Sequence, residues 1–335
     1  MNQFSAQAKT GEEPIDIRPV FELCAGDMSS VNSLIRDSLD SNVVLIRQIA
    51  EYIIGSGGKR LRPMLVILAS QACGYRRNHH IKLAAIIEFI HTATLLHDDV
   101  VDESELRRGK ESAHAVWGNA ASVLVGDFLY SRSFQMMVDI DSMRLMDILS
   151  DATNTIAEGE VEQLLNMHDP DVNRDRYFSV VEKKTAKLFE AACQLGAVLA
   201  GKREWEFSLA EFGRELGMAF QVADDVLDYM SDAGTLGKNS GDDLAEGKPT
   251  LPLILCREQA SPEARQIIDN AIRQGDVKQL DRIAAMIRDG GALDQAMQHA
   301  RDRASAALAA LDPLPDSTWK GAMQSLARYS VTRDY

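Results

Sequence analysis

Two short clusters of aspartates have residue types and a spacing that suit chemistry on phosphates. Both follow the pattern Asp-Asp-x-x-Asp, one in segment 98–102 and one in segment 224–228. On a helix, residues four positions apart share a face, so the first and last aspartates of each cluster would point the same way. Carboxylate oxygens suit Mg²⁺, which proteins bind with one or two carboxylates together with substrate phosphates. The clusters therefore predict a site for Mg²⁺ and a diphosphate, and the candidate residues are Asp98, Asp99, Asp102, Asp224, Asp225 and Asp228.

A single cluster of this kind has a simpler explanation. Acidic residues at a helix end are often only solvated charges, and one motif match carries a real false-positive rate. Each cluster here follows a strongly apolar stretch, however, and like charges one helical turn apart repel unless a cation compensates them. Two copies in matching surroundings favour the cation site.

Basic residues in four segments could hold the negative charge of the phosphates. Gly57 and Gly58 precede three cations at an expected helix start, where exposed N–H groups and the helix dipole favour an anion. Taken one at a time, most of these cations would be ordinary surface charges. The basic residues of the four segments are Lys59, Arg60, Arg62, Arg107, Arg108, Lys183, Lys184, Lys238 and Lys248.

Long helices are expected to carry these residues. Proline is absent from 64–169 and from 171–248, and segment 81–99 is apolar almost throughout, as in a helix buried on most sides. A strand of that length would be abnormal, and no alternation of strands and helices is visible. The predicted fold class is all-α. Further helical patterns cover 121–138, 143–165, 177–200, 206–230, 261–274, 276–288 and 292–311, and the helices beyond residue 249 show no chemical constellation and are interpreted as packing around the bundle.

The composition excludes several classes of function. A net charge of −14 argues against a general nucleic-acid binder, because neutralising phosphates needs a basic surface. The four cysteines form no CxxC pair, so neither a zinc cluster nor a redox dithiol is indicated. No apolar run reaches the roughly 20 residues that cross a bilayer. The polar, acidic N-terminus predicts no secretory signal, so we infer a cytoplasmic protein with a flexible extension over residues 1–20.

Five segments together resemble the trans-isoprenyl diphosphate synthases, which are polyprenyl synthases. They occur in the family order within residues 45–255, and their joint specificity is very high. The resemblance implies a single domain, 1–335, built as one large bundle of long helices around a central cavity, with both aspartate clusters at its mouth and three Mg²⁺ ions between them. The segments are GGKRLRP (57–63), HDDVVDESELRRGK (97–110), Lys184-Thr185, FQVADDVLDY (220–229) and GKNSGDDLAEGKPTLPL (237–253).

By position, the resemblance implies a role for each candidate residue. The main metal carboxylates would be Asp98, Asp102, Asp224 and Asp228, supported by Asp99 and Asp225. The allylic diphosphate would be held by Arg107, Lys184, Thr185, Gln221, Lys238 and Lys248, with Lys184 also counted as catalytic. Isopentenyl diphosphate would be held by Lys59, Arg62, His91 and Arg108. A lone histidine in an apolar helix is usually a core residue, and only the alignment makes His91 a ligand.

The implied reaction lengthens an isoprenoid chain. Ionising the C–O bond to a diphosphate leaves an allylic cation and a multiply charged anion, so catalysis chiefly stabilises the leaving group. The double bond of isopentenyl diphosphate would attack the cation, and no protein nucleophile is needed. The expected primer is farnesyl diphosphate, and the expected product is a long all-trans chain, by similarity octaprenyl, for a quinone side chain. A geranylgeranyl or solanesyl product is the alternative.

The length of the product depends on the residues along the path of the tail. Thr94 and Ala93, four and five positions before Asp98, lie about one helical turn deeper. Short-chain members of the family tend to carry a bulky aromatic residue there, so these small residues indicate an open tunnel. Met137 is the candidate floor, although methionine is also a common core filler.

Other functions remain open at this point. A terpene cyclase would lack GGKRLRP and carry a different second metal motif, a non-catalytic partner subunit would lack some of the charged ligands, and a metal-dependent phosphohydrolase would need a histidine-rich site. We further expect a homodimer, because the apolar helix around 83–97 and its neighbours would not be covered fully by one bundle.

Overall fold

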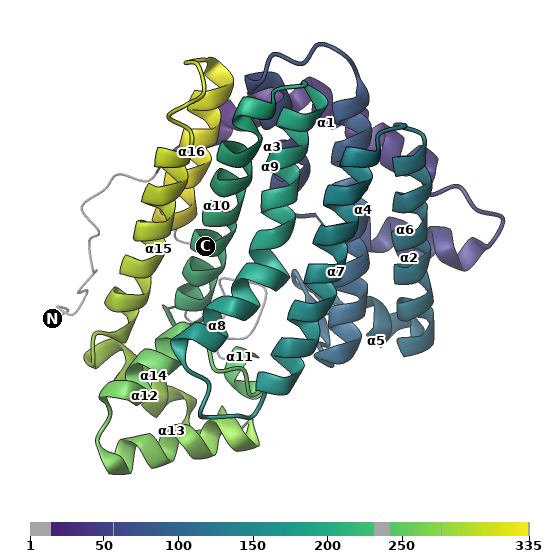
Figure 1. Ribbon diagram of the computed structural model, residues 1–335. Coiled ribbons are helices and arrows are strands. Elements are labelled where there is room, and N and C mark those ends of the chain that lie inside the picture. The colour runs from purple at the N-terminus through teal and green to yellow at the C-terminus, as the bar shows by residue number, and fades with distance from the viewer. Residues whose placement is uncertain (1–14, 56, 231–241, 276, 334–335) are drawn as a thin grey trace, which may run out of the picture.

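The computed structural model describes residues 15–55, 57–230, 242–275 and 277–333, which form a bundle of helices (Figure 1). The all-α prediction is confirmed. The helices are α1 (Arg18–Ser38), α2 (Val44–Gly55), α3 (Leu61–Ala72), α4 (His79–Val101), α5 (Ala113–Trp117), α6 (Asn119–Val138), α7 (Met143–Asn166), α8 (Arg174–Val180), α9 (Lys187–Leu199), α10 (Arg203–Met230), α11 (Asp242–Ala245), α12 (Leu251–Gln259), α13 (Pro262–Gln274), α14 (Leu280–Asp289), α15 (Ala292–Ala310) and α16 (Thr318–Thr332), with a π-helical segment Val181–Ala186 and a 3-10 turn Val277–Gln279.

Helix α4 is buried in the middle of the bundle. The helices α1, α3, α6 and α9 all pack against it. Its residues from Leu83 to Ile87, together with Phe89 and Ile90, are almost completely shielded from solvent. Burial on several sides therefore explains the nearly continuous apolar sequence of 81–99, as predicted. The C-terminal end of α4 carries the first aspartate cluster.

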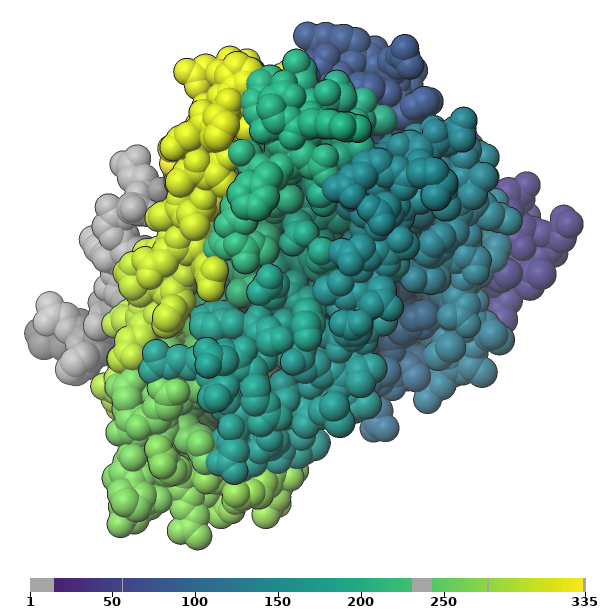
Figure 2. Space-filling view, viewed as in Figure 1, coloured from purple at the N-terminus to yellow at the C-terminus, as the bar shows by residue number. Residues whose placement is uncertain are grey.

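Helix α10 joins the two hydrophobic clusters of the molecule. Its first half, with Leu209 and Phe212, packs in the larger cluster with α1 to α7 and α9. Its second half, with Val222 and Val226, packs in a smaller cluster with α8 and α12 to α15. The short helices α12, α13 and α14 close one end of the bundle, and α15 and α16 cover one flank, as the yellow surface shows (Figure 2). The helices beyond residue 249 pack on the bundle as expected, and the single domain over 1–335 stays a prediction.

Two local features differ from the sequence-based expectations. Although the predicted fold class is all-α, the segment between α4 and α5 contains a short antiparallel hairpin of β1 (Leu106–Arg107) and β2 (Lys110–Glu111), turning at Arg108 and Gly109, which both have positive φ angles. The predicted flexible extension over 1–20 is wrong at its C-terminal boundary, because α1 begins at Arg18 and Val20 is buried. Residues 1–14 lie outside the described residues.

The helix predicted over 177–200 is divided by the π-helical segment. A π segment inserts an extra residue into a turn and often occurs at functional sites. Here it contains Lys184 and Thr185, and α7 crosses it at Gly159. A Cβ atom at Gly159 would lie 2.8 Å from the backbone nitrogen of Lys184, so only glycine allows α7 to approach the segment this closely. The close approach fixes the position of Lys184 next to α7.

Candidate active site

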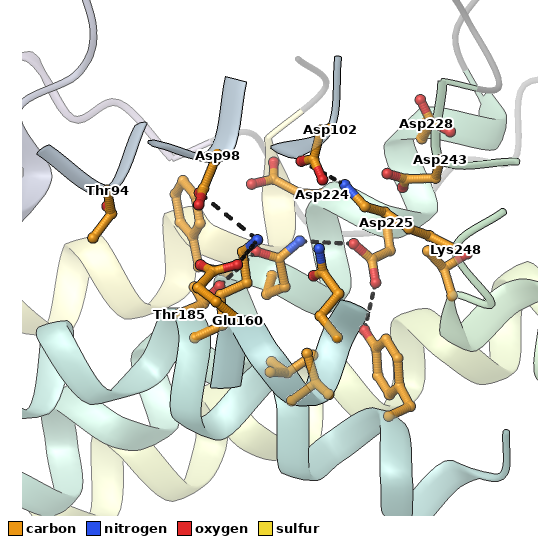
Figure 3. A pocket seen from close by; sticks show the side chains of 18 of the residues that line it. Thr94, Asp98, Asp102, Glu160, Thr185, Asp224, Asp225, Asp228, Asp243 and Lys248 are labelled. Carbon is orange, nitrogen blue, oxygen red and sulfur yellow. Dashed lines mark hydrogen bonds and ion pairs between the residues drawn. The ribbon is translucent and has the colours of Figure 1, made fainter. Parts of the chain in front are cut away.

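A cavity of about 490 Å³ lies where the C-terminal ends of α4 and α10 come together. Both aspartate clusters face it from opposite sides, α4 supplying the first and α10 the second (Figure 3). The rest of the wall comes from α7, α8, the π-helical segment, the hairpin, the segment 243–250 and Arg62 of α3. The structure thus brings together most of the predicted ligands, and those that line the cavity are Arg62, His91, Asp98, Asp102, Arg107, Arg108, Lys184, Thr185, Gln221, Asp224, Asp225, Asp228 and Lys248.

In the first cluster the outer aspartates face the cavity and the middle one faces the protein. Asp98 lies 3.7 Å from the Nζ atom of Lys184, and Asp102 lies 2.8 Å from that of Lys248. Asp99 is fully buried and paired with Arg107. Burial raises the pKa of Asp99, and the Arg107 guanidinium opposes that shift. Asp98 and Asp102 are therefore the carboxylates that can reach a ligand in the cavity.

In the second cluster the middle aspartate, Asp225, is also held by protein groups, although unlike Asp99 it lines the cavity. Asp224 forms an ion pair of 2.7 Å with Arg333, and its side chain remains 42% exposed. Asp225 is buried and accepts hydrogen bonds from the Tyr177 hydroxyl, at 2.5 Å, and from the Gln221 amide, at 2.8 Å. Burial and the charge of Asp243 raise the pKa of Asp225 well above its usual range, while the two hydrogen bonds oppose the shift. The outer aspartates again face the cavity.

A basic pocket adjoins the first cluster. The Arg62 guanidinium lies 3.1 Å from Nε2 of His91 and stacks 4.5 Å from the centre of the Phe189 ring. Burial and the charge of Arg62 lower the pKa of His91 well below its usual range, so His91 is neutral and can serve as a hydrogen-bonding partner. Burial lowers the pKa of Arg62 only to about 10, so this residue keeps its charge at neutral pH. Arg108 contacts the Gly57 carbonyl. These groups form a site suited to an anion.

Lys59 lies beside this pocket and is the one predicted isopentenyl diphosphate ligand on the described chain that does not line the cavity. Its Nζ donates to the Tyr329 hydroxyl on α16 at 2.9 Å. Lys238, predicted for the allylic diphosphate, lies outside the described residues. The assignment of the individual ligands to the two diphosphates stays a prediction.

Lys184 lies between two carboxylates. Its Nζ is 2.5 Å from Glu160 on α7 and 3.7 Å from Asp98. Burial and the nearby Asp98 raise the pKa of Glu160 to about 7, and the Lys184 charge opposes the shift. Lys248 is similarly paired with Asp102 and Glu246, and although burial opposes its charge, these carboxylates raise its pKa. Lys248 therefore stays protonated at neutral pH, and the ammonium groups of both lysines face the cavity, where they can bind phosphate oxygens.

The predicted residues of length control occupy different environments. Thr94 lines the cavity, and its hydroxyl donates to the carbonyl oxygen of His91 at 2.8 Å. Ala93 and Met137 are in the hydrophobic core, 1% and 2% exposed, and do not line the cavity. Their effect on product length stays a prediction.

Sequence reasoning missed several side chains that hold predicted ligands in place. Glu88 is buried and pairs with Arg60, which also donates to the Ile54 carbonyl at 2.7 Å. Only Glu88 gave a signal in the sequence, because it is an acidic residue inside an apolar helix. No local pattern distinguished the other side chains from ordinary residues. These side chains are Glu88, Glu160, Tyr177, Glu246, Tyr329 and Arg333.

The donor set fits Mg²⁺ bound together with a substrate. Within the described ranges, no three histidine, cysteine, aspartate or glutamate side chains form a complete metal-binding group. The outer aspartates instead form two carboxylate pairs on one cavity, which suits a cation that takes its remaining ligands from water and phosphates. Asp98, Asp102, Asp224 and Asp228 would hold it.

A helical bundle that joins two aspartate pairs and an arginine-lined pocket in one cavity defines a class of enzymes that bind diphosphates with divalent cations. Residues 43–289 match the Polyprenyl synthetase family. The chain belongs to this family, as the sequence-based resemblance predicted, and the family binds divalent metal.

Several relatives resemble the chain over nearly its full length. The octaprenyl diphosphate synthase of Escherichia coli (strain K12) is 51% identical over 322 residues, covering 96% of this chain and 100% of the relative. The all-trans-nonaprenyl-diphosphate synthase (geranyl-diphosphate specific) of Rhodobacter capsulatus is 46% identical over 310 residues, covering 92% and 95%. The crystal structure of a polyprenyl synthase from Caulobacter crescentus CB15, complexed with calcium and isoprenyl diphosphate, matches with a TM-score of 0.93 at 45% identity and covers 97% of this chain and 100% of that one.

Proposed function

We propose that this chain elongates an allylic diphosphate, in our expectation farnesyl diphosphate, with successive isopentenyl diphosphates to an octaprenyl product for a quinone side chain. The chain is a long-chain trans-polyprenyl diphosphate synthase, a prenyltransferase. The observation that supports the reaction best is the shared cavity, in which two aspartate pairs and a separate arginine and histidine pocket could hold two diphosphates side by side. The identity of 51% to an octaprenyl synthase supports the product.

The residues on the cavity wall would divide the work between the two substrates. Lys184, Thr185 and Lys248 lie next to the aspartate pairs, where they would bind the diphosphate that leaves. Arg62 and His91 would hold isopentenyl diphosphate in the basic pocket. When bound, Mg²⁺ supplies positive charge that stabilises the leaving diphosphate. The reaction needs no protein nucleophile.

We propose three Mg²⁺ ions for each active site. Two separate carboxylate pairs support more than one ion, since Mg²⁺ is usually held by only one or two protein carboxylates. The number three follows from the resemblance to the family. Titration of the protein with Mn²⁺ in the presence of inorganic diphosphate, followed by electron paramagnetic resonance, would count them.

We also propose a homodimer. The sequence predicted that one bundle would leave the helix around 83–97 and its neighbours partly uncovered. For α4 itself this is not so, because the neighbouring helices cover it. Exposed apolar side chains lie instead on the adjacent helices α6 and α7, and include Leu124 at 66%, Leu164 at 55% and Leu165 at 73% exposure. A face of this kind on two packed helices suits a second copy of the chain. Light scattering at micromolar concentration should give twice the chain mass, and a monomer mass would refute the proposal.

We also propose that the enzyme is located in the cytoplasm. None of the helices in the described ranges could serve as a transmembrane span.

The main proposal is tested by incubating the purified protein with farnesyl diphosphate, labelled isopentenyl diphosphate and Mg²⁺ and separating the products by chromatography. An octaprenyl product supports it, a nonaprenyl or geranylgeranyl product would correct the length, and the absence of any condensation would refute the prenyltransferase function.

A further inference from the structure

Tyr177 is a buried polar residue that the proposed reaction does not use. It lies on α8, and its exposed fraction is 7%. Its hydroxyl donates to Oδ2 of Asp225 on α10 at 2.5 Å, in the wall of the cavity (Figure 3). A hydroxyl in this environment loses its hydration, so the hydrogen bond to the carboxylate must compensate for that loss.

The hydrogen bond belongs to a chain of contacts that connects two parts of the site. Gln221 donates from Nε2 to the other carboxylate oxygen of Asp225 at 2.8 Å, and its Oε1 accepts from the Thr185 hydroxyl at 3.0 Å. Thr185 belongs to the π-helical segment, next to Lys184. The chain therefore runs from Tyr177 through Asp225 and Gln221 to the segment that carries the diphosphate-binding lysine.

The two oxygens of Asp225 are both engaged by protein donors. Asp225 lines the cavity together with Asp224 and Asp228, but both of its carboxylate oxygens are thereby held by protein groups. Without the Tyr177 hydroxyl, one oxygen of a buried carboxylate would lose its donor, and the side chain would rotate or attract water. Either change moves the turn of α10 that carries the second cluster relative to the π-helical segment.

We propose that Tyr177 is a positioning residue that holds the second aspartate cluster in register with Lys184 and Thr185, so that the cation and the allylic diphosphate bind together. This inference rests on the proposed function, because it assigns the allylic diphosphate to this side of the cavity. It predicts a selective effect: removal of the hydroxyl weakens the binding of Mg²⁺ with a diphosphate and of the allylic substrate, while the isopentenyl diphosphate pocket around Arg62 and His91 is unaffected.

The variant Tyr177→Phe removes only the hydroxyl and keeps the ring that packs against Phe178. We expect the KM for farnesyl diphosphate and the Mg²⁺ concentration for half-maximal rate to rise about tenfold, as for loss of a hydrogen bond to a charged group. The KM for isopentenyl diphosphate should change by less than about twofold. Tyr75→Phe is the matched control, because Tyr75 is 8% exposed, lies outside the cavity and packs on His80.

Calorimetry provides a readout that does not depend on turnover. Inorganic diphosphate titrated into the protein with Mg²⁺ should bind about tenfold more weakly to Tyr177→Phe than to the wild type or Tyr75→Phe. In a double-mutant cycle, the effect of Tyr177→Phe on this affinity should largely disappear in the Asp225→Asn background, because the proposed role acts through that carboxylate.

The inference would be overturned by unchanged diphosphate affinity and farnesyl KM in Tyr177→Phe, by an equal rise in both substrate KM values, or by full additivity with Asp225→Asn. A variant that unfolds at a lower temperature but binds normally would assign Tyr177 a structural role alone and would also overturn it. If the wild type failed to condense the two substrates, the proposed function would fail, whereas the calorimetric comparison would still decide the role of Tyr177.

Discussion

Replacing Ala93 with tyrosine should shorten the product of the enzyme. Ala93 lies on α4 five residues before Asp98, about 7 Å further along the helix. It is 1% exposed and adjoins Thr94, which lines the cavity. A growing tail that follows α4 away from the aspartates must pass this level. A ring placed there adds well over 100 Å² of side-chain surface to a packed region and should block the tail.

The expected product length follows from the depth of Ala93 below Asp98. A block about one and a half helical turns below Asp98 should leave room for about three or four isoprene units. The first condensation should persist, because none of the ligands on the cavity wall is changed. Overpacking should lower the free energy of unfolding by about 1 to 3 kcal/mol, which a folded bundle of this size can tolerate.

Mass spectrometry of products made from farnesyl diphosphate and isopentenyl diphosphate would test this reasoning. Ala93→Ser is the matched control and should keep the wild-type product. Met137→Ala should lengthen the product, because truncation opens space in the core where the last isoprene unit would otherwise collide. If both Ala93→Tyr and Met137→Ala gave the wild-type product distribution, the tail would not follow this face of α4, and the octaprenyl proposal would lose its physical basis.

Three further predictions concern the charges around the cavity. Asp98→Ala and Asp224→Ala should each reduce the condensation rate by orders of magnitude without loss of the fold, and a rate within about threefold of wild type for either would contradict its role as a metal carboxylate. Arg333→Ala should lower kcat/KM about tenfold, because it removes the 2.7 Å partner of Asp224, and Arg333→Lys should recover only part of the loss; equal activity of all three proteins would argue against this contact. Glu160→Gln should raise the free energy of unfolding in EDTA at pH 8. The pKa of Glu160 is about 7 in the folded protein and ordinarily 4.5, so its ionisation costs stability progressively as the pH rises from 4.5 through 7. We expect a gain of about 1 to 2 kcal/mol at pH 8, below the full linkage value because the side chain is partly exposed, and almost none at pH 4. A gain that did not depend on pH would show that titration of Glu160 is not its cause.

The fold class and most of the cavity ligands could be predicted from the sequence because their signals are local. An apolar run such as 81–99 identifies a buried helix by its own periodicity, and the spacing of Asp98 and Asp102 places two carboxylates on one face without reference to the rest of the chain. The glycines before Lys59 indicate the helix start at Leu61 for the same reason.

The tertiary structure alone decided which distant side chains support these ligands. Arg333, near the end of the chain, reaches Asp224 because α16 packs against α10. Tyr177 meets Asp225 because α8 packs on the π-helical segment and that segment packs against α10. Ala93 is buried in the core although the neighbouring Thr94 lines the cavity. Such contacts depend on the angles and distances at which helices pack, and these are set by side chains far apart in the sequence, so no short segment of the chain contains them.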